Sequence, residues 1–277
     1  RRFGAVRSQG RLERERDVFE DVAQRAERLL AIAAAAESSD PGQFSGKVAV
    51  VTGASSGIGW AITERLVTDG WQVVGISRTG WVPEGALSVS ADLAEDGVGE
   101  AITQAQNLLG GVDAYVGAAG STYEQLAARA DLEQVNTQLR LHYLSNYEAI
   151  SLLLPGMVRA RWGRIVLLSS VVAQSGMAGL SAYGAAKGAL EALVKSLALE
   201  VGRRAITVNA VAPGYIQTPM TQSLSPRQQE RYLQRTGAAR PGTPQDVAGP
   251  VAFLLSDDAA YVNGQILHVD GAMGVGN

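Results

Sequence analysis

Tyr183 and Lys187 stand four residues apart and could together transfer a proton. The surrounding residues predict a helix, in which a separation of four places both side chains on one face. A nearby ammonium favours the ionised form of a phenol, whose ordinary pKa is about 10, and so makes the phenol a usable proton donor and acceptor at neutral pH. Such pairs are also common on ordinary helix surfaces, so this pair alone does not define a site.

A glycine-rich stretch at residues 52–59 follows a short Val-rich run and precedes a helical pattern. Glycine lets the chain turn tightly and lets an anion approach the backbone, while the start of the next helix presents free N–H groups. The spacing Gly53-x-x-x-Gly57-x-Gly59 departs from the common Gly-x-Gly-x-x-Gly fingerprint. The stretch is therefore a structural turn or a diphosphate site, and its place between strand and helix favours the diphosphate site.

Arg78 follows the second predicted strand (72–76), where a dinucleotide-binding fold reads the adenosine ribose, and no acidic residue stands beside it. A guanidinium forms paired charged hydrogen bonds with a phosphate, whereas a carboxylate would bind the ribose hydroxyls and repel a 2′-phosphate. Arg78 thus favours NADP over NAD, although it could also be an ordinary solvated arginine. Asp92, after the third predicted strand, could face the adenine or cap the next helix.

The elements that must position these residues alternate between short Val/Ile-rich runs and longer helical patterns. This alternation predicts a single Rossmann-like, doubly wound α/β domain, with a parallel sheet covered by helices on both faces. The seven predicted strands are 48–51, 72–76, 87–90, 112–116, 164–168, 206–211 and 265–269. The predicted helices are 58–68, 97–109, 132–157, 182–201, 226–234 and 244–255.

The composition excludes several classes of protein. The chain has 277 residues with 24 Lys+Arg and 27 Asp+Glu, a near-neutral balance that argues against nucleic acid as the main partner. It has no cysteine, and its two histidines, His142 and His268, lack metal-ligand spacing, so no metal site is expected. No apolar run is long enough to span a membrane. These features fit a cytoplasmic protein without a membrane partner.

The first 45 residues differ from the remainder. We therefore divide the chain into an N-terminal extension (1–45) and a main domain (46–277). Apolar residues at helical spacing predict an amphipathic helix over residues 11–36, and turn-forming residues predict a linker over 37–43. This helix would pack on its own domain, pack on a neighbouring subunit, or dock a partner. An apolar run at residues 29–36 has the length of a signal-peptide core, but the charges before it argue against export.

Ser170 lies thirteen residues before Tyr183, at the end of a predicted strand. Together with the glycine-rich turn, Tyr183 and Lys187, it makes residues 46–273 resemble the short-chain dehydrogenase/reductase family. The resemblance includes residues 209–214, Thr218 and Met220, and the closing stretch 262–271. The subgroup that the chain is most similar to is the 3-oxoacyl-carrier-protein reductases and the related polyketide ketoreductases.

The resemblance implies an NAD(P)-dependent enzyme that reduces a ketone to a secondary alcohol. Tyr183 would protonate the carbonyl oxygen, Ser170 would hydrogen-bond the same oxygen, and Lys187 would tune Tyr183 and hold the nicotinamide ribose. NADP(H) is the preferred cofactor and NAD(H) is possible. The implied cofactor-binding residues, besides Tyr183 and Lys187, are Gly53, Ser55, Ser56, Gly57, Ile58, Gly59, Arg78, Asp92, Leu93, Ala119, Gly120, Pro213, Gly214, Ile216 and Thr218.

Two positions depart from the family pattern. His142 stands where relatives commonly carry an asparagine that helps hold a water in a proton relay; it could serve as a catalytic relay residue or simply fill space. Ala118, within the sequence Gly117-Ala-Ala-Gly120, replaces a second asparagine whose amide would brace the centre of the sheet. Neither change removes the Ser, Tyr and Lys set.

Substrate identity is expected to reside in residues 174–180 and 215–239, which would cover the open side of the nicotinamide. The candidate substrate residues are Gln174, Met177, Tyr215 and Met220. The expected substrate is a small ketone, in particular a β-ketoacyl thioester or a polyketide-type carbonyl. Arg161 and Arg204 occur where carrier-protein reductases bear basic residues, so an acyl carrier protein is a possible partner.

The resemblance also implies a homodimer or homotetramer. An NAD-linked alcohol or diol dehydrogenase remains an alternative function, and a nucleotide-binding regulator without catalysis remains a further one.

Overall fold

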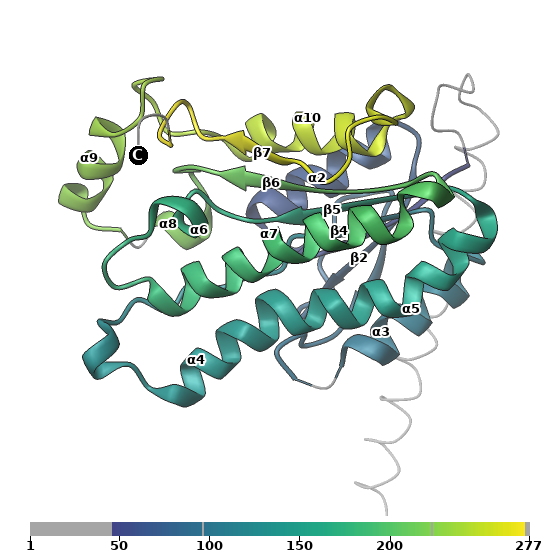
Figure 1. Cartoon of the computed structure of the whole chain (residues 1–277), viewed down its shortest axis with the longest axis horizontal. Coiled ribbons are helices and arrows are strands. Elements are labelled where there is room, and N and C mark those ends of the chain that lie inside the picture. Colours follow the sequence, from purple (N-terminus) through teal and green to yellow (C-terminus); the bar gives the residue numbers. More distant parts are fainter. Residues whose placement is uncertain (1–45, 96, 223, 275–277) are drawn as a thin grey trace, which may run out of the picture. The chain divides into compact units, whose positions relative to one another are not determined.

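The computed structural model describes residues 46–95, 97–222 and 224–274. Within them, seven strands form one parallel sheet in the order β3-β2-β1-β4-β5-β6-β7, so the doubly wound α/β fold is confirmed (Figure 1). The strands are β1 Val48–Thr52, β2 Gln72–Ser77, β3 Leu87–Ser90, β4 Ala114–Gly117, β5 Gly163–Leu168, β6 Ile206–Pro213 and β7 Ile266–Val269. The predicted N-terminal helix and linker lie outside the described residues.

The strands at the centre of the sheet are buried on both faces. Every residue of β1, β4, β5 and β6 is buried, which explains why their sequences are continuous apolar runs rather than alternating ones. Strand β1 pairs with β2 on one side and with β4 on the other, so the strand order reverses between β1 and β4. Ligands of open α/β sheets bind at the carboxyl ends of the strands beside such a reversal.

Helices cover both faces of the sheet. On one face, α2 (Gly57–Thr68) packs against α10 (Pro244–Leu255), while α3 (Val98–Leu109), α5 (Ser145–Ala160) and α7 (Ser181–Val201) lie on the other (Figure 1). The other helices are α4 Leu132–Leu139, α6 Val172–Ser175, α8 Pro219–Gln222 and α9 Pro226–Gln234, with 3₁₀ turns η1 Ala127–Arg129, η3 Gly202–Arg204 and η4 Asp257–Ala259. None of the helices in the described residues is both long and apolar enough to cross a bilayer.

The helix predicted over residues 132–157 is helical throughout in the structure, but a π-helical turn, η2 (Arg140–Leu144), lies between α4 and α5. The Asn146 side chain donates to the backbone carbonyl of His142 at 2.7 Å, and its own oxygen accepts from the Tyr115 hydroxyl at 2.9 Å. These buried side-chain bonds accompany the widened turn, and no local periodicity signals it. π-helical turns are rare and are frequently found at functional sites.

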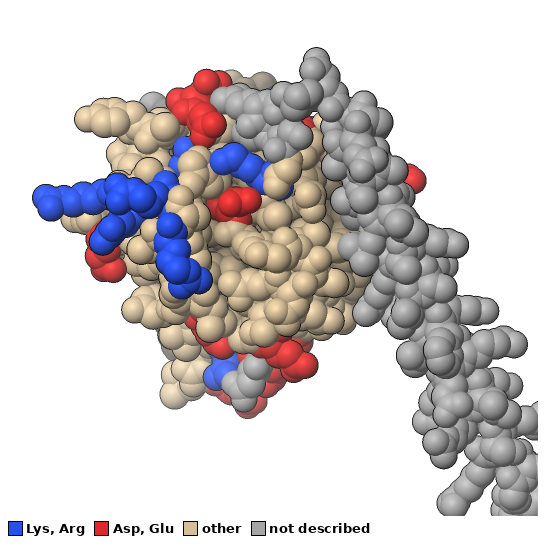
Figure 2. Space-filling model, turned by 90° about the vertical axis from the view of Figure 1, so that its right-hand side faces the viewer, with Lys and Arg blue, Asp and Glu red and all other residues tan. Residues whose placement is uncertain are grey.

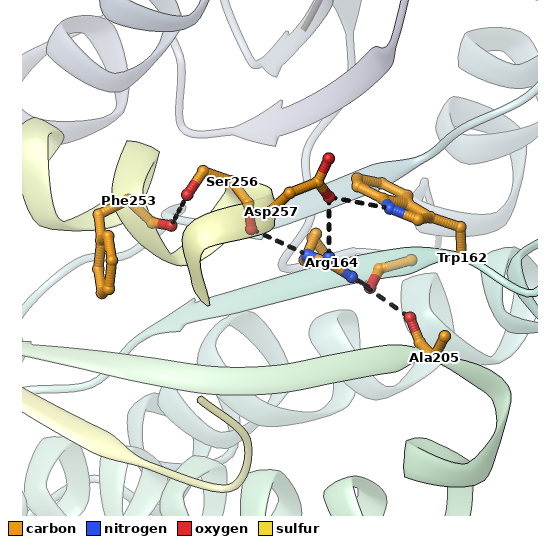
Figure 3. Close-up of polar contacts among 7 residues, drawn as sticks. Trp162, Arg164, Ala205, Phe253, Ser256 and Asp257 are labelled. Atoms are coloured by element: carbon orange, nitrogen blue, oxygen red, sulfur yellow. Dashed lines mark hydrogen bonds and ion pairs between the residues drawn. The ribbon is translucent and has the colours of Figure 1, made fainter. Parts of the chain in front are cut away.

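Buried polar contacts anchor the amino end of β5 (Figure 3). The Arg164 guanidinium is almost fully buried and donates to the backbone carbonyls of Gly163, Ala205 and Ser256. It also pairs with Asp257, whose carboxylate accepts from the Trp162 indole. Arg164 thereby ties β5 to the segments that precede β6 and follow α10. This scaffold supports the strands whose opposite, carboxyl ends carry the site.

Candidate active site

Glycines 53, 57 and 59 form a cradle where β1 turns into α2. A Cβ on Gly59 would collide with the Gly53 carbonyl oxygen, and a Cβ on Gly53 would lie 2.8 Å from the Ala119 Cα. Gly53 and Gly57 also have positive φ values of 70° and 55°, which favour glycine. Close backbone approach therefore requires these glycines, as the sequence predicted.

The start of α2 is open to an anion. Its N-cap residue, Ser56, makes no side-chain cap bond, and its first turn carries no acidic residue. The free N–H groups and the positive end of the helix dipole thus remain available for a diphosphate. Next to the cradle, Thr52 Oγ1 accepts from the backbone amides of Ala118 and Ala119, at 3.0 and 3.1 Å, and fixes the end of β1 against the end of β4.

A cleft runs from this cradle along the carboxyl ends of β1, β2 and β4. Arg78 is exposed at its edge, and the backbone carbonyl of Arg78 accepts from the Ser90 hydroxyl at 2.9 Å. Asp92 lines the cleft, but one of its oxygens accepts from the amide of Ala94 and so stabilises the local turn. The other predicted cofactor residues that line the cleft are Gly53, Ser55, Ser56, Gly57, Ile58, Gly59, Leu93, Ala119, Gly120 and Thr218.

An apolar cavity adjoins the cleft and contains the predicted catalytic residues. Ser170 follows β5, and Tyr183 and Lys187 occupy successive turns of α7. The Lys187 Nζ donates to the Leu168 carbonyl at 2.5 Å and lies 5.7 Å from the centre of the Tyr183 ring. The Ser170 Oγ accepts from the Val172 amide at 3.2 Å. Pro213, Gly214 and Ile216, predicted to flank the nicotinamide, line the same cavity.

Burial governs the protonation states of these groups. It raises the pKa of the Tyr183 phenol above its ordinary value, against a smaller lowering by the hydrogen bond with Ser170. Burial also lowers the pKa of Lys187 to about 7. The expectation that an adjacent ammonium makes the phenol more acidic is therefore not met, because desolvation is the largest influence on this pKa. Tyr183 is a neutral phenol at physiological pH and is poised to donate a proton.

His142 lies in the π-helical turn and faces this cavity. Its Nε2 is 2.8 Å from the Ser121 carbonyl oxygen, which requires a proton on Nε2 and leaves Nδ1 as a bare acceptor. Nδ1 is buried and has no hydrogen-bond partner. Burial, followed by the charge of Lys187, lowers the pKa of His142 to about 3. The imidazole is thus neutral at physiological pH.

Three of the four predicted substrate residues line the cavity, namely Met177, Tyr215 and Met220. Gln174 is absent from the lining, and its side-chain amide instead donates to the buried carboxylate of Glu191 at 3.3 Å. The sequence analysis missed Glu124 and Met273, which also line the cavity. Neither belongs to a motif, and each reaches the cavity only through the folding of a distant loop.

Arg161 and Arg204 lie at the opposite end of the sheet from the cavity, since each precedes the first residue of its strand, β5 or β6, by two positions. This end faces the viewer in Figure 2, where basic side chains gather on one side. Both arginines are exposed.

Among the described residues, no group of three or more His, Cys, Asp or Glu side chains could hold a metal ion.

A glycine cradle that opens into a cavity with a neutral phenol and a buried lysine fits an α/β oxidoreductase. Comparison with known proteins gives its family. A family model described as "Enoyl-(Acyl carrier protein) reductase" matches residues 53–274. The chain belongs to the short-chain dehydrogenase/reductase family and is an oxidoreductase.

Individual relatives are similar over almost their whole length. The 3-oxoacyl-[acyl-carrier-protein] reductase FabG of Salmonella typhimurium is 40% identical over 242 residues, which are 83% of this chain and 98% of that protein. The reductase MabA of Mycobacterium bovis, with the same activity in its name, is 35% identical over 246 residues, 88% of this chain and 99% of that protein.

Among solved structures, a putative NAD(P)-dependent gluconate 5-dehydrogenase from Beutenbergia cavernae, with bound NADP, superposes with a TM-score of 0.77. It is 33% identical, and the match covers 82% of this chain and 96% of that one.

Proposed function

We propose that this protein is an NADPH-dependent ketone reductase that converts a β-ketoacyl thioester, or a related polyketide-type carbonyl, to a secondary alcohol. The observation that carries the proposal is the neutral Tyr183 phenol, which is partly buried and lines an apolar cavity beside Ser170 and Lys187. Reduction of a ketone needs a proton donor at the carbonyl oxygen, and a phenol with a raised pKa is in the protonated form at neutral pH.

NADPH, when bound, supplies the hydride, and the chain's own side chains manage the oxygen that becomes the alcohol. The Tyr183 hydroxyl donates its proton to that oxygen, and the Ser170 hydroxyl hydrogen-bonds the same oxygen. These donors are held in place before the reaction, a type of contribution worth several kcal/mol of transition-state stabilisation. Lys187, held by the Leu168 carbonyl, would stabilise the tyrosinate that remains and would hold the nicotinamide ribose.

His142 takes part as a hydrogen-bond acceptor. Its bare Nδ1 is buried near the Lys187 ammonium, which influences the pKa of the imidazole. We propose that Nδ1 accepts a hydrogen bond on the path by which protons reach Lys187. The donor is the Lys187 ammonium itself or one water between the two residues. The imidazole remains neutral throughout, because a group with a pKa of about 3 does not carry a proton at neutral pH.

Arg78 supports NADPH as the preferred cofactor. It is exposed at the edge of the cleft at the end of β2, where a 2′-phosphate can be reached by a guanidinium. The similar protein from Beutenbergia cavernae holds NADP. We expect Arg78→Ala to weaken NADPH binding by about tenfold and NADH binding much less, because one charge-assisted contact contributes about 1.5 kcal/mol or more.

The relatives named as acyl-carrier-protein reductases support an acyl thioester as the substrate. Docking of the carrier on Arg161 and Arg204 has less support, because the six residues of β5 place these arginines about 20 Å from the cavity end of the sheet.

Exposed apolar side chains on the faces of α5 and α7, such as Tyr147 and Leu199, support a homodimer or homotetramer. A cytoplasmic location stays a prediction.

The decisive experiment measures NADPH oxidation by the full chain with a panel of 3-oxoacyl thioesters and cyclic or aromatic ketones. We expect turnover by the wild type and a loss of at least a thousandfold in Tyr183→Phe, which keeps the ring and removes the proton donor. Undiminished turnover in Tyr183→Phe would contradict the proposal, as would no turnover of any ketone by the wild type.

A second candidate, an NAD-linked alcohol or sugar-acid dehydrogenase, is favoured by the gluconate 5-dehydrogenase in the name of one similar structure. Faster oxidation of such alcohols with NAD than reduction of ketones with NADPH would select it.

A further inference from the structure

The charged side chains that line the substrate cavity are few. Among the described residues they are Lys187, which belongs to the catalytic set, and Glu124. No arginine lines this cavity in the part of the chain that the structure describes. His142 also lines the cavity, but its imidazole is neutral. Among the described lining residues, a carboxylate on a substrate would therefore meet no cationic side chain except the catalytic lysine, whose ammonium is already held by the Leu168 carbonyl.

Most of the other polar side chains in the cavity are occupied. The Tyr232 hydroxyl donates to the sulfur of Met177 at 3.0 Å, and the Tyr232 ring stacks on the Tyr215 ring with 5.2 Å between centroids. The Ser169 hydroxyl donates to Glu191 at 2.7 Å, and the Thr221 hydroxyl donates to the Ile216 carbonyl at 2.8 Å. Beyond the reacting carbonyl, the cavity thus offers mainly aromatic rings and aliphatic groups to a substrate.

Glu124 lies at the rim of the cavity, because it both lines the cavity and is exposed. A Cβ on Gly179 would lie 3.3 Å from the Glu124 Cγ, so the side chain packs against the loop between α6 and α7. The adjacent backbone bond from Gln125 N to the Gly179 carbonyl, at 2.8 Å, holds the two loops together.

The carboxylate of Glu124 acts on the inner wall of the cavity. Burial raises the pKa of the Tyr232 phenol, and the nearby charge of Glu124 raises it further. Arg231 and Arg235, on the same helix as Tyr232, act in the opposite sense. Neither arginine lines the cavity, whereas Glu124 does. The charge of Glu124 therefore reaches the inner wall of the cavity from its rim, opposed by the two arginines behind that wall.

We propose that Glu124 selects substrates by charge, so that the cavity accepts ketones with uncharged apolar substituents and rejects ketones that bear a carboxylate. This proposal rests on the proposed ketone reductase function and specifies its substrate class. An anionic substituent would lose its hydration in a cavity without a cation to pair with it and would be repelled by Glu124 at the rim. A neutral acyl chain avoids both costs and buries its apolar surface against the two tyrosine rings and Met177.

The test uses a matched pair of substrates, a 3-oxohexanoyl thioester and the same thioester with a carboxylate at the far end of its chain. For the wild type we expect kcat/KM to favour the neutral substrate by at least tenfold. We expect Glu124→Gln to reduce this ratio by roughly three- to tenfold, and Glu124→Lys to reduce it further. Added salt should reduce the wild-type ratio, because the carboxylate is exposed and its field is screened.

Control variants separate a local effect from a general one. Glu200→Gln removes an exposed carboxylate at the far end of α7 and should leave the wild-type ratio unchanged. Arg231→Gln and Arg235→Gln should change the ratio less than Glu124→Gln does. The proposal is overturned if Glu124→Gln leaves the ratio unchanged, or if the two arginine variants change it more.

A binding measurement distinguishes failure of this proposal from failure of the proposed function. The dissociation constants of octanoate and octanamide, measured by NMR titration, need no turnover. If no thioester is reduced, the proposed function fails and the binding ratio alone decides the role of Glu124. We expect octanamide to bind more tightly than octanoate to the wild type, with a smaller difference for Glu124→Gln. The proposal would be overturned if octanamide and octanoate differed in affinity by the same factor for the wild type and for Glu124→Gln.

Discussion

The imidazole of His142 meets the phenol ring of Tyr183 edge-on, with 5.2 Å between the ring centroids and 89° between the ring planes. The two residues come from different helical elements, the π-helical turn and α7. A Cβ on Gly120 would lie 2.6 Å from the His142 Cε1, so Gly120 packs directly against the imidazole. The histidine thus helps to fix the position of the phenol, in addition to any role in proton supply.

The first prediction concerns the pH dependence of stability. The folded state keeps His142 neutral down to a pKa of about 3, whereas an unfolded histidine binds a proton below about 6.5. The unfolded state therefore binds more protons between these values, and the free energy of unfolding falls as the pH is lowered. We expect this group to contribute a loss of about 2.5 kcal/mol between pH 6 and pH 4, measured by urea unfolding.

The His142→Asn variant should lack this contribution and show a shallower pH dependence than the wild type. Equal slopes for the wild type and His142→Asn would contradict the interpretation.

The second prediction concerns the pH dependence of ketone reduction and of alcohol oxidation. Lys187 has a pKa of about 7, and its protonated form resupplies the proton that Tyr183 gives up during reduction. We expect kcat/KM for ketone reduction to decline as the pH rises above about 7, and kcat/KM for alcohol oxidation to rise over the same range. In Lys187→Arg the guanidinium stays charged, so the residual activity should lose this inflection. An unchanged inflection in that variant would assign it to another group.

The third prediction concerns the glycine cradle. A methyl group at Gly59 would collide with the Gly53 carbonyl oxygen, so Gly59→Ala should displace the turn. We expect the dissociation constant of NADPH, measured by fluorescence titration, to increase at least tenfold. The free energy of unfolding should decrease by about 1–3 kcal/mol.

The control for this variant is Gly156→Ala on α5, where a Cβ would meet nothing within 4 Å. Alanine is the better helix former, so this change should leave NADPH binding unaltered and stabilise the protein by up to about 1 kcal/mol. Normal NADPH binding in Gly59→Ala would show that the cradle does not hold the diphosphate.

The fourth prediction separates the hydrogen bonds of Arg164 from its ion pair (Figure 3). Arg164→Met leaves the carbonyls of Gly163, Ala205 and Ser256 without this donor, and we expect it to cost about 3 kcal/mol of stability. Asp257→Asn should cost less than about 1 kcal/mol, because the side chain of Asp257 is 52% exposed. Thermal unfolding of both variants tests the difference, and equal losses would give the ion pair the larger role.

Residues that act through local backbone geometry could be recognised in the sequence. The glycine cradle follows directly from the strand, turn and helix around it, and Tyr183 with Lys187 follows from helical spacing. Each strand was predicted to within two residues at its amino end, because apolar runs bounded by turn residues mark buried parallel strands. Ser170 was placed beside Tyr183 by resemblance, and the structure brings both into one cavity.

Residues that act through distant contacts could not be recognised in this way. Glu124 reaches the cavity because its loop packs on the loop of Gly179, and Tyr232 closes it by bonding Met177 across 55 positions of the chain. Gln174 has the expected position in the sequence, yet Glu191 holds its amide away from the cavity lining. Only the folded chain shows which neighbours compete for a polar side chain.

The sequence by itself determined the sheet, its helical cover and the side chains available for hydride and proton chemistry, since hydrophobic periodicity and glycine placement are local properties of the chain. The tertiary structure decided the π-helical turn, the rim of the cavity and the protonation states of Tyr183, Lys187 and His142. Those states depend on desolvation, and desolvation is set by every atom packed around a group, most of which come from remote parts of the sequence.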